Sequence, residues 1–121
     1  MNKNNSLEVI KDCTTYIKNH LQDTLTAESL ASRYGYSLYH FCHIFKICCD
    51  MSPGKYIRLL RLEKAKKDIL SGMSITQAGF DNGFETSSGF SKAFRKEYGI
   101  SAREYLKQNK ESEVLIMLHV E

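Results

Sequence analysis

The sequence contains an internal repeat, and this repeat constrains the fold more than any other feature. Five pairs of positions match at a constant offset of 49 residues: Phe41/Phe90, Phe45/Phe94, Lys46/Arg95, Ser52/Ser101 and Tyr56/Tyr105. Three pairs upstream match at an offset of 48, namely Ala31/Gly79, Gly35/Gly83 and Tyr36/Phe84. Self-similarity at such a period indicates two copies of one supersecondary unit, and the change of offset places one extra residue in the turn of the second copy.

Each copy has the residue pattern of a helix-turn-helix. A small residue lets two helices approach closely, a glycine four positions later can adopt the positive φ of a tight turn, and an aromatic on the second helix fills the angle between the helices. These residues are Ala31, Gly35 and Phe41 in the first copy and Gly79, Gly83 and Phe90 in the second. The sequence therefore predicts two helix-turn-helix units.

Helix signals occur along the whole chain. It has one proline and seven glycines among 121 residues, and strict period-2 alternation is nearly absent, which favours an all-α fold. Residues that can cap a helix N-terminus precede seven helical segments: Ser6, Thr26, Ser37, Ser52, Ser74, Thr86 and Ser101. We predict about seven helices, the last one short. The expected parts are a first helix-turn-helix subdomain (1–52), a long linker helix (53–72), a second helix-turn-helix subdomain (73–108) and a tail (109–121).

Several strings of the sequence resemble a known family. SLYHFCHIFK leads into SPGKYIRLLRLEKAKKDIL, and GFETSSGFSKAFRKEYGIS follows. Together they are similar to the DNA-binding domain of AraC/XylS-type bacterial transcription regulators, over about residues 6 to 107. The resemblance implies a sequence-specific DNA-binding regulator, most often an activator, that binds double-stranded DNA as a monomer with two recognition helices in successive major grooves. It also implies RNA polymerase as a partner.

The first recognition helix is expected within residues 37–49. Helical spacing turns Phe41, Ile44, Phe45 and Cys48 inward, so the opposite side presents Leu38, Tyr39, Cys42, His43 and Lys46. Of these, Tyr39, Cys42 and His43 are expected at base edges and Lys46 on a phosphate. Family members commonly carry Arg where this chain has His43, and histidine cannot form a bidentate contact to guanine. The first unit is expected either to read fewer bases or to read thymine methyls through Tyr39 and Cys42.

The second recognition helix is expected after Thr86. With Phe90 and Phe94 in the core, the exposed side presents Ser87, Ser88, Ser91, Lys92 and Lys96. Geometry and resemblance agree on Ser87, Ser88, Ser91 and Lys92 as DNA-reading residues, and Arg95 matches Lys46 as a phosphate contact. The alternative is that the serines are simply solvent-exposed helix residues. Where the family usually has Ile-Ala, this chain has Ala78-Gly79, so we predict that the second unit is the less stable one.

The net charge of +3 is unevenly distributed. Residues 37–67 carry +5, residues 1–36 carry 0, and residues 68–106 and 107–121 carry −1 each. A positive block of this kind suits a polyanion, or it is a solvated helix face.

The segment from His40 to Cys49 holds two histidines and three cysteines, which raises the possibility of a metal site. No CxxC or HxxxH pair organises them, so no metal or cofactor is predicted. Two other interpretations remain: a redox- or metal-responsive regulator using Cys42, His40 and His43, and a protein-interaction bundle or antagonist without specific DNA binding. Cys42 and His43 are adjacent on a helix and cannot act as nucleophile and base, so no enzyme is predicted.

No signal peptide or membrane-spanning run is visible, which favours a reducing cytoplasmic location with free thiols and no membrane partner. The apolar run 114–120, VLIMLHV, is interpreted as a β-strand. Since Met1 stands directly before the first helix, one hypothesis is that this strand begins a C-terminal effector domain. The alternative is a stand-alone regulator whose tail packs on the helices.

Overall fold

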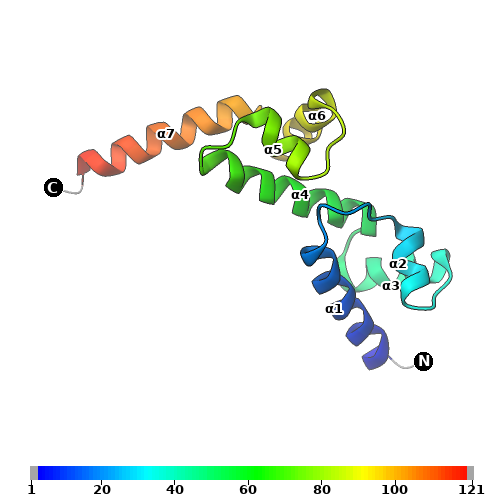
Figure 1. Cartoon of the computed structure of the whole chain (residues 1–121). Helices are drawn as coiled ribbons and strands as arrows, with labels where there is room; N and C mark the ends of the chain where they lie inside the picture. Colours follow the sequence, from blue (N-terminus) through cyan, green and yellow to red (C-terminus); the bar gives the residue numbers. More distant parts are fainter. Residues whose placement is uncertain (1–2, 120–121) are drawn as a thin grey trace. The chain divides into compact units, whose positions relative to one another are not determined.

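The structure is a computed structural model that describes the backbone of residues 3–119 and the side chains of residues 5–110. Every regular element in this described part is an α-helix, as predicted (Figure 1). The helices are α1 (Lys3–Asn19), α2 (Ala27–Arg33), α3 (Leu38–Cys49), α4 (Pro53–Leu70), α5 (Ile75–Asp81), α6 (Ser87–Tyr98) and α7 (Ala102–His119). The chain divides into two compact units, Met1–Arg61 and Leu62–Glu121, and the division falls within α4.

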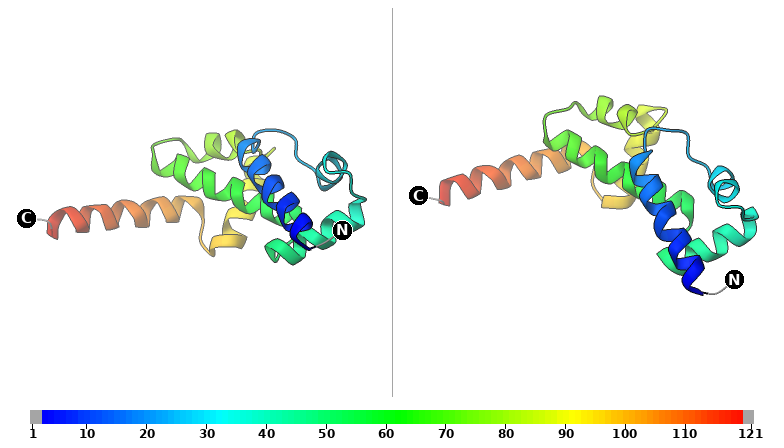
Figure 2. Two further views of the ribbon diagram at one scale, coloured as in Figure 1. Left: turned by 90° about the horizontal axis from the view of Figure 1, so that it is seen from below. Right: turned by 60° about the horizontal axis from the view of Figure 1, so that its bottom comes forward.

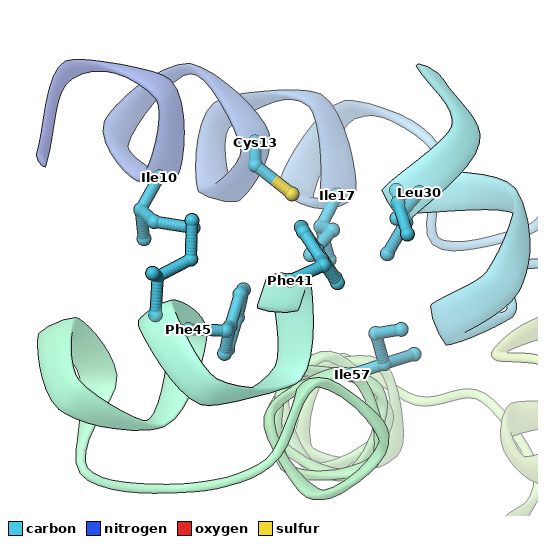
Figure 3. Packing of buried hydrophobic residues seen from close by; sticks show 9 residues of the cluster. Ile10, Cys13, Ile17, Leu30, Phe41, Phe45 and Ile57 are labelled. Carbon is cyan, nitrogen blue, oxygen red and sulfur yellow. The ribbon is translucent and has the colours of Figure 1, made fainter. Parts of the chain in front are cut away.

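The first unit has a core made by α1, α2, α3 and the beginning of α4. Figure 3 shows Ile10, Cys13 and Ile17 of α1 pointing toward the rings of Phe41 and Phe45 on α3. The α1 residues recur at three- and four-residue steps, which places them on one face of the helix. The core cluster of this unit is Ile10, Cys13, Ile17, Leu30, Ala31, Phe41, Ile44, Phe45 and Ile57. Full burial of each large apolar side chain contributes about 1.5–3 kcal/mol.

The turn between α2 and α3 is built as the repeat predicts. Thr26 caps α2 in a capping box with Ser29, and the Ser37 hydroxyl accepts the backbone N–H of His40 at the start of α3. Gly35 has a φ of 75°, a left-handed conformation that costs glycine little. The backbone N–H of Tyr36 donates to the carbonyl of Ala31 over 2.9 Å and closes the turn.

The second unit builds the same turn between α5 and α6. Ser74 and Thr86 cap the two helices, and Gly83 has a φ of 91°. The backbone N–H of Phe84 donates to the carbonyl of Gly79 over 3.1 Å. A Cβ atom added at Gly79 would lie 2.8 Å from the ring of Phe90, so the predicted need for a small residue here is confirmed.

The core of the second unit is mainly aromatic. The rings of Phe90 and Phe94 meet at 5.9 Å between centroids, and Tyr98 and Tyr105 pack edge-on against Phe94. The remaining buried residues of this cluster come from α4, α5 and α7: Leu62, Ala65, Ile69, Ala78 and Ala102. These rings bury one face of α6, and the opposite face of the helix stays exposed.

Three predictions about the two ends of the chain were wrong. The first helix already includes Lys3, so Ser6 lies inside it and is not its N-cap. The last helix is not short, and residues 114–119 continue it instead of forming a strand (Figure 1, Figure 2). A short apolar run does not by itself distinguish strand from buried helix, and a helix capped at Ser101 propagates readily through the helix-forming residues 107–113. Val120, the last residue of the predicted strand, lies outside the described residues.

Candidate nucleic-acid interface

The exposed face of α3 carries most of the residues predicted to read DNA. Tyr39 is 83% exposed, and Leu38, His43 and Lys46 are also exposed. The rings of Tyr39 and His43 lie nearly parallel, with 6.3 Å between centroids, because residues four apart on a helix are neighbours. Ile47 follows at the next such step and is 70% exposed. The sequence analysis missed Ile47, although the spacing of 39, 43 and 47 could have identified it.

Two cysteines of α3 lie differently from the prediction. Cys42 is half-buried and packs against the core of the first unit, so it does not point outward. Cys48, expected inward, is exposed, while its neighbour Cys49 packs against that core. In the last turn of α3 the buried side continues along the row of residues four apart, from Phe41 through Phe45 to Cys49. Local periodicity could not show which flank of α3 the core occupies there.

The histidines and cysteines of this segment do not converge. His40 packs edge-on against Tyr36 with 5.0 Å between ring centroids, whereas His43 pairs with Tyr39. Among the residues whose side chains are described, no three His, Cys, Asp or Glu residues could hold one metal ion. Burial raises the pKa of Cys13 to about 12 and also raises the pKa of Cys49. Both therefore stay protonated at neutral pH, the unreactive form of a thiol.

The exposed face of α6 carries all the residues predicted for the second unit. Thr86 accepts the backbone N–H of Gly89 over 2.9 Å and fixes the start of the helix. The exposed positions are Ser87, Ser88, Ser91, Lys92 and Arg95. Ser91, Lys92 and Arg95 line a groove of about 540 Å³ together with residues from the starts of α5 and α7: Ile75, Thr76, Ser101, Ala102 and Arg103. Arg103 was not predicted. The repeat was identified from pairs of similar residues, and the residue that corresponds to Arg103 in the first copy is Gly54.

Part of the positive block at residues 37–67 makes contacts within the protein. The guanidinium of Arg61 donates to the carbonyls of Leu21 and Asp23, at 3.1 and 2.8 Å, and so holds the loop after α1. Lys64 pairs with Asp68 at 2.7 Å. Lys66 pairs with Glu63 at 3.3 Å and lies 4.4 Å from the centre of the Tyr98 ring. Three of the seven positive side chains thus stabilise the fold, which weakens the interpretation of this block as one DNA-binding surface.

Comparisons with known proteins identify the class. A helix-turn-helix domain family model matches residues 30–108 of the 121. The chain therefore belongs to this family, and within it to the AraC-type DNA-binding domains of bacterial transcription regulators.

Individual relatives agree with this assignment. The chain is 33% identical over 90 residues to the HTH-type transcriptional activator RhaS of Escherichia fergusonii and 29% identical over 91 residues to the Right origin-binding protein of Escherichia coli K12. Each match covers 74% of this chain and 32% of the relative, so the chain spans about a third of the length of these curated relatives. The C-terminal domain of AraT, a response regulator from Geobacillus stearothermophilus, has a similar structure: the TM-score is 0.78 at 28% identity, covering 83% of this chain and 84% of that one.

No helix in the described part of the chain is both long and apolar enough to cross a membrane.

Proposed function

We propose that this chain recognises a defined sequence in double-stranded DNA and regulates transcription, with α3 and α6 placed in successive major grooves of one duplex. The observation that carries the proposal is the duplicated turn. In both units the second helix is held by buried aromatic rings on one side and leaves its other side exposed, with aromatic, aliphatic and cationic side chains on α3 and polar and cationic side chains on α6. This is the arrangement by which a recognition helix reaches base edges.

In the first unit, Tyr39 and His43 are proposed to contact base edges and Lys46 a phosphate, with Leu38 at the start of the same face. Cys42 was expected to contact base edges, but it is half-buried. We propose that the exposed Ile47 makes this contact instead. An exposed tyrosine and isoleucine favour contact with the methyl group of thymine. The neutral form of His43 cannot form the fork that arginine makes with guanine. The first unit is therefore proposed to read a thymine-containing block.

In the second unit, Ser87, Ser88, Ser91 and Lys92 are proposed to face the bases. Short hydroxyls favour water-mediated contacts, and Lys92 is the strongest partner for guanine among them. Arg95 is proposed to contact a phosphate, as Lys46 does in the first unit. This set of contacts is expected to discriminate less sharply between bases than the first unit does.

The regulatory role is proposed to be activation, with RNA polymerase as the protein partner and the cytoplasm as the location. Activation is supported by the name of RhaS, a transcriptional activator, to which the chain is 33% identical. No catalytic role is proposed, because the relatives are transcription regulators that match through their helix-turn-helix domains.

Selection of binding sites from a random pool of duplex DNA at physiological salt tests the proposal. The expected result is an enriched motif with two blocks about ten base pairs apart, since two recognition helices one helical turn apart read one face of the duplex. A variant with Tyr39→Ala and His43→Ala should lose enrichment of one block and keep the other. Binding that depends on salt but enriches no motif would refute sequence recognition, and no binding at all would favour an interaction bundle or antagonist.

A further inference from the structure

The groove beside α6 is lined mainly by cationic and hydroxyl side chains. It is lined by three cationic side chains, Lys92, Arg95 and Arg103, and by three hydroxyl side chains, Thr76, Ser91 and Ser101. Ile75 and Ala102 supply its apolar wall, and no carboxylate is among the lining residues. The groove is therefore positively charged and rich in hydrogen-bond donors.

Among the residues whose side chains are described, none of the three cations has a counterion. In the part of the chain whose side chains are described, the ion pairs are Lys64 with Asp68 and Lys66 with Glu63, and neither involves the groove. The guanidinium groups of Arg95 and Arg103 and the ammonium group of Lys92 also make no side-chain hydrogen bond within that part. Like charges gathered at one concave site without a partner repel each other and attract an anion.

The first unit does not repeat the charged residues of this groove, although it repeats the fold. At the positions of Lys92, Arg95 and Arg103 it has His43, Lys46 and Gly54. At the position of Thr76 it has an acid, Glu28, and at that of Ser91 it has Cys42. The corresponding site of the first unit thus combines one lysine with one carboxylate, so the charge is specific to the second unit and does not follow from the turn.

We propose that the α6 groove holds a phosphodiester group of the DNA backbone, and that the second unit thereby supplies the electrostatic part of the affinity. This inference rests on the proposed DNA binding. The guanidinium groups of Arg95 and Arg103 can each match two phosphate oxygens in a bidentate contact. The hydroxyls of Thr76 and Ser101 can satisfy the remaining oxygens, which leaves Ser91 and Lys92 for the base contacts proposed above. Such contacts position the helix and are independent of base sequence, whereas the exposed aromatic and aliphatic residues of α3 discriminate between bases.

The first test compares Arg103→Gln with wild type in DNA binding measured over a range of salt concentrations, on a selected duplex and on an unrelated one. The variant should bind both duplexes roughly ten-fold more weakly at physiological salt, and the slope of log K against log salt should shrink by about one. Lys107→Gln is the matched control, because it removes an exposed cation from α7 outside the groove. It should leave the slope within error of wild type. Circular dichroism melting checks that both variants fold.

The second test identifies the source of the phosphate. Single phosphates of the selected duplex are replaced one at a time by neutral methylphosphonate. At one phosphate position, the methylphosphonate should weaken binding of the wild-type chain but cause no further loss of affinity in Arg103→Gln. The two changes would then remove the same contact. In parallel, inorganic phosphate is titrated at constant ionic strength while amide signals of Lys92 and Arg103 are followed by NMR.

The outcomes separate the two proposals. An enriched motif with an unchanged salt slope in Arg103→Gln would overturn the groove and leave sequence recognition intact. Saturable binding of inorganic phosphate without any methylphosphonate effect would assign the groove to a free anion and also overturn it. Failure to enrich any motif, with the slope still reduced, would refute the proposed sequence recognition and keep the phosphate site.

Discussion

The two helix-turn-helix units close their turns with the same backbone hydrogen bond but build around it with different side chains. In each, the N–H after the turn glycine donates to the carbonyl of the small residue, Ala31 in one unit and Gly79 in the other. The methyl group of Ala31 fits into the first core, whereas Phe90 lies so close to Gly79 that a Cβ atom there would meet its ring at 2.8 Å. The backbone turn thus tolerates different packing at its centre.

The side-chain hydrogen bonds next to the turn also differ between the two units. In the first unit, the hydroxyl of Tyr34 donates to Asp12 of α1 over 2.6 Å. In the second, the residue at the repeat position is Asn82, whose amide donates to Asp68 of α4 over 2.9 Å and to the carbonyl of Ala78 over 2.8 Å. The phenol of Tyr34 and the amide of Asn82 therefore have the same role. Each connects the C-terminal end of the first helix of the helix-turn-helix, α2 or α5, to a carboxylate on the preceding helix, α1 or α4. What the repeat conserves is this geometry and not the residue type.

The largest expected difference between the units is in local stability. Gly79 has a lower helix propensity than Ala31, and Ala78 stands where the first unit has the larger Leu30. Together these changes should lower the free energy of opening of residues 75–97 by about 2–3 kcal/mol relative to residues 27–48. Hydrogen exchange measured residue by residue reports both values. Equal protection of the two segments would contradict the comparison.

Substitutions at the small residue of each turn, Gly79 and Ala31, should change the free energy of unfolding by different amounts. Gly79→Ala should destabilise the protein by about 2 kcal/mol, because overpacking against the Phe90 ring outweighs the roughly 1 kcal/mol gained in helix propensity. The matched change, Ala31→Gly, should cost only about 1 kcal/mol. Urea denaturation of both variants gives the two numbers. A stabilised Gly79→Ala variant would show that Phe90 moves aside freely.

The stabilisation that the second unit gains from the hydrogen bond between Asn82 and Asp68 should depend on pH. Hydrogen bonds from Lys64 and Asn82 lower the pKa of Asp68, so its ionised form is favoured by folding. Their contribution to stability is present above the ordinary pKa of an aspartate and is lost as pH falls through the lower pKa of the folded state. Asn82→Ala should therefore cost about 1–1.5 kcal/mol at neutral pH and less in acid, where Asp68 is protonated.

Urea denaturation of Asn82→Ala at several pH values from neutral to acidic measures this trend. Tyr34→Phe in the first unit is the matched control, since it also removes one hydrogen bond to an aspartate. A cost of Asn82→Ala that is the same at every pH would show that the carboxylate of Asp68 is not its relevant partner.

The smallest expected effect is a gain of DNA affinity in the first unit. No atom lies within 4 Å of a Cβ placed at Gly54, so a side chain can start without a clash at the position that corresponds to Arg103. Gly54→Arg should strengthen binding to any duplex by about three-fold and increase the salt slope. Gly54→Gln is the control without charge. If both variants bind alike, a cation at this position does not reach a phosphate.

Local signals predicted most of the fold, and tertiary packing accounts for what they missed. Thr26, Ser37 and Thr86 were correctly predicted as caps, because a cap is a contact between residues three apart. The duplicated turn was correctly predicted because its glycines need a positive φ. The inward and outward assignments of Cys42 and Cys48 failed, since they depend on where α1 and α4 lie against α3 and not on α3 itself.

The α6 groove shows a second limit. Ser91 and Lys92 were predicted from helical spacing together with the family resemblance, and Arg95 from its match to Lys46 in the repeat. Arg103 and Thr76 join them only through the packing of α5 and α7 against α6. Matching positions in a repeat identify a shared fold. The mismatched positions, such as Gly54 against Arg103, show where the surface chemistry of the two copies differs.

The most direct test of two unequal reading units is to scramble each block of a selected site in turn and measure the affinity of the wild-type chain at physiological salt. We predict a loss of roughly 100-fold when the block read by α3 is scrambled, because base contacts there carry the discrimination, and of less than about ten-fold for the block under α6. The Tyr39→Ala and His43→Ala variant assigns the blocks, because scrambling the α3 block should no longer affect it. Equal losses for both blocks, or none for either, would contradict the account.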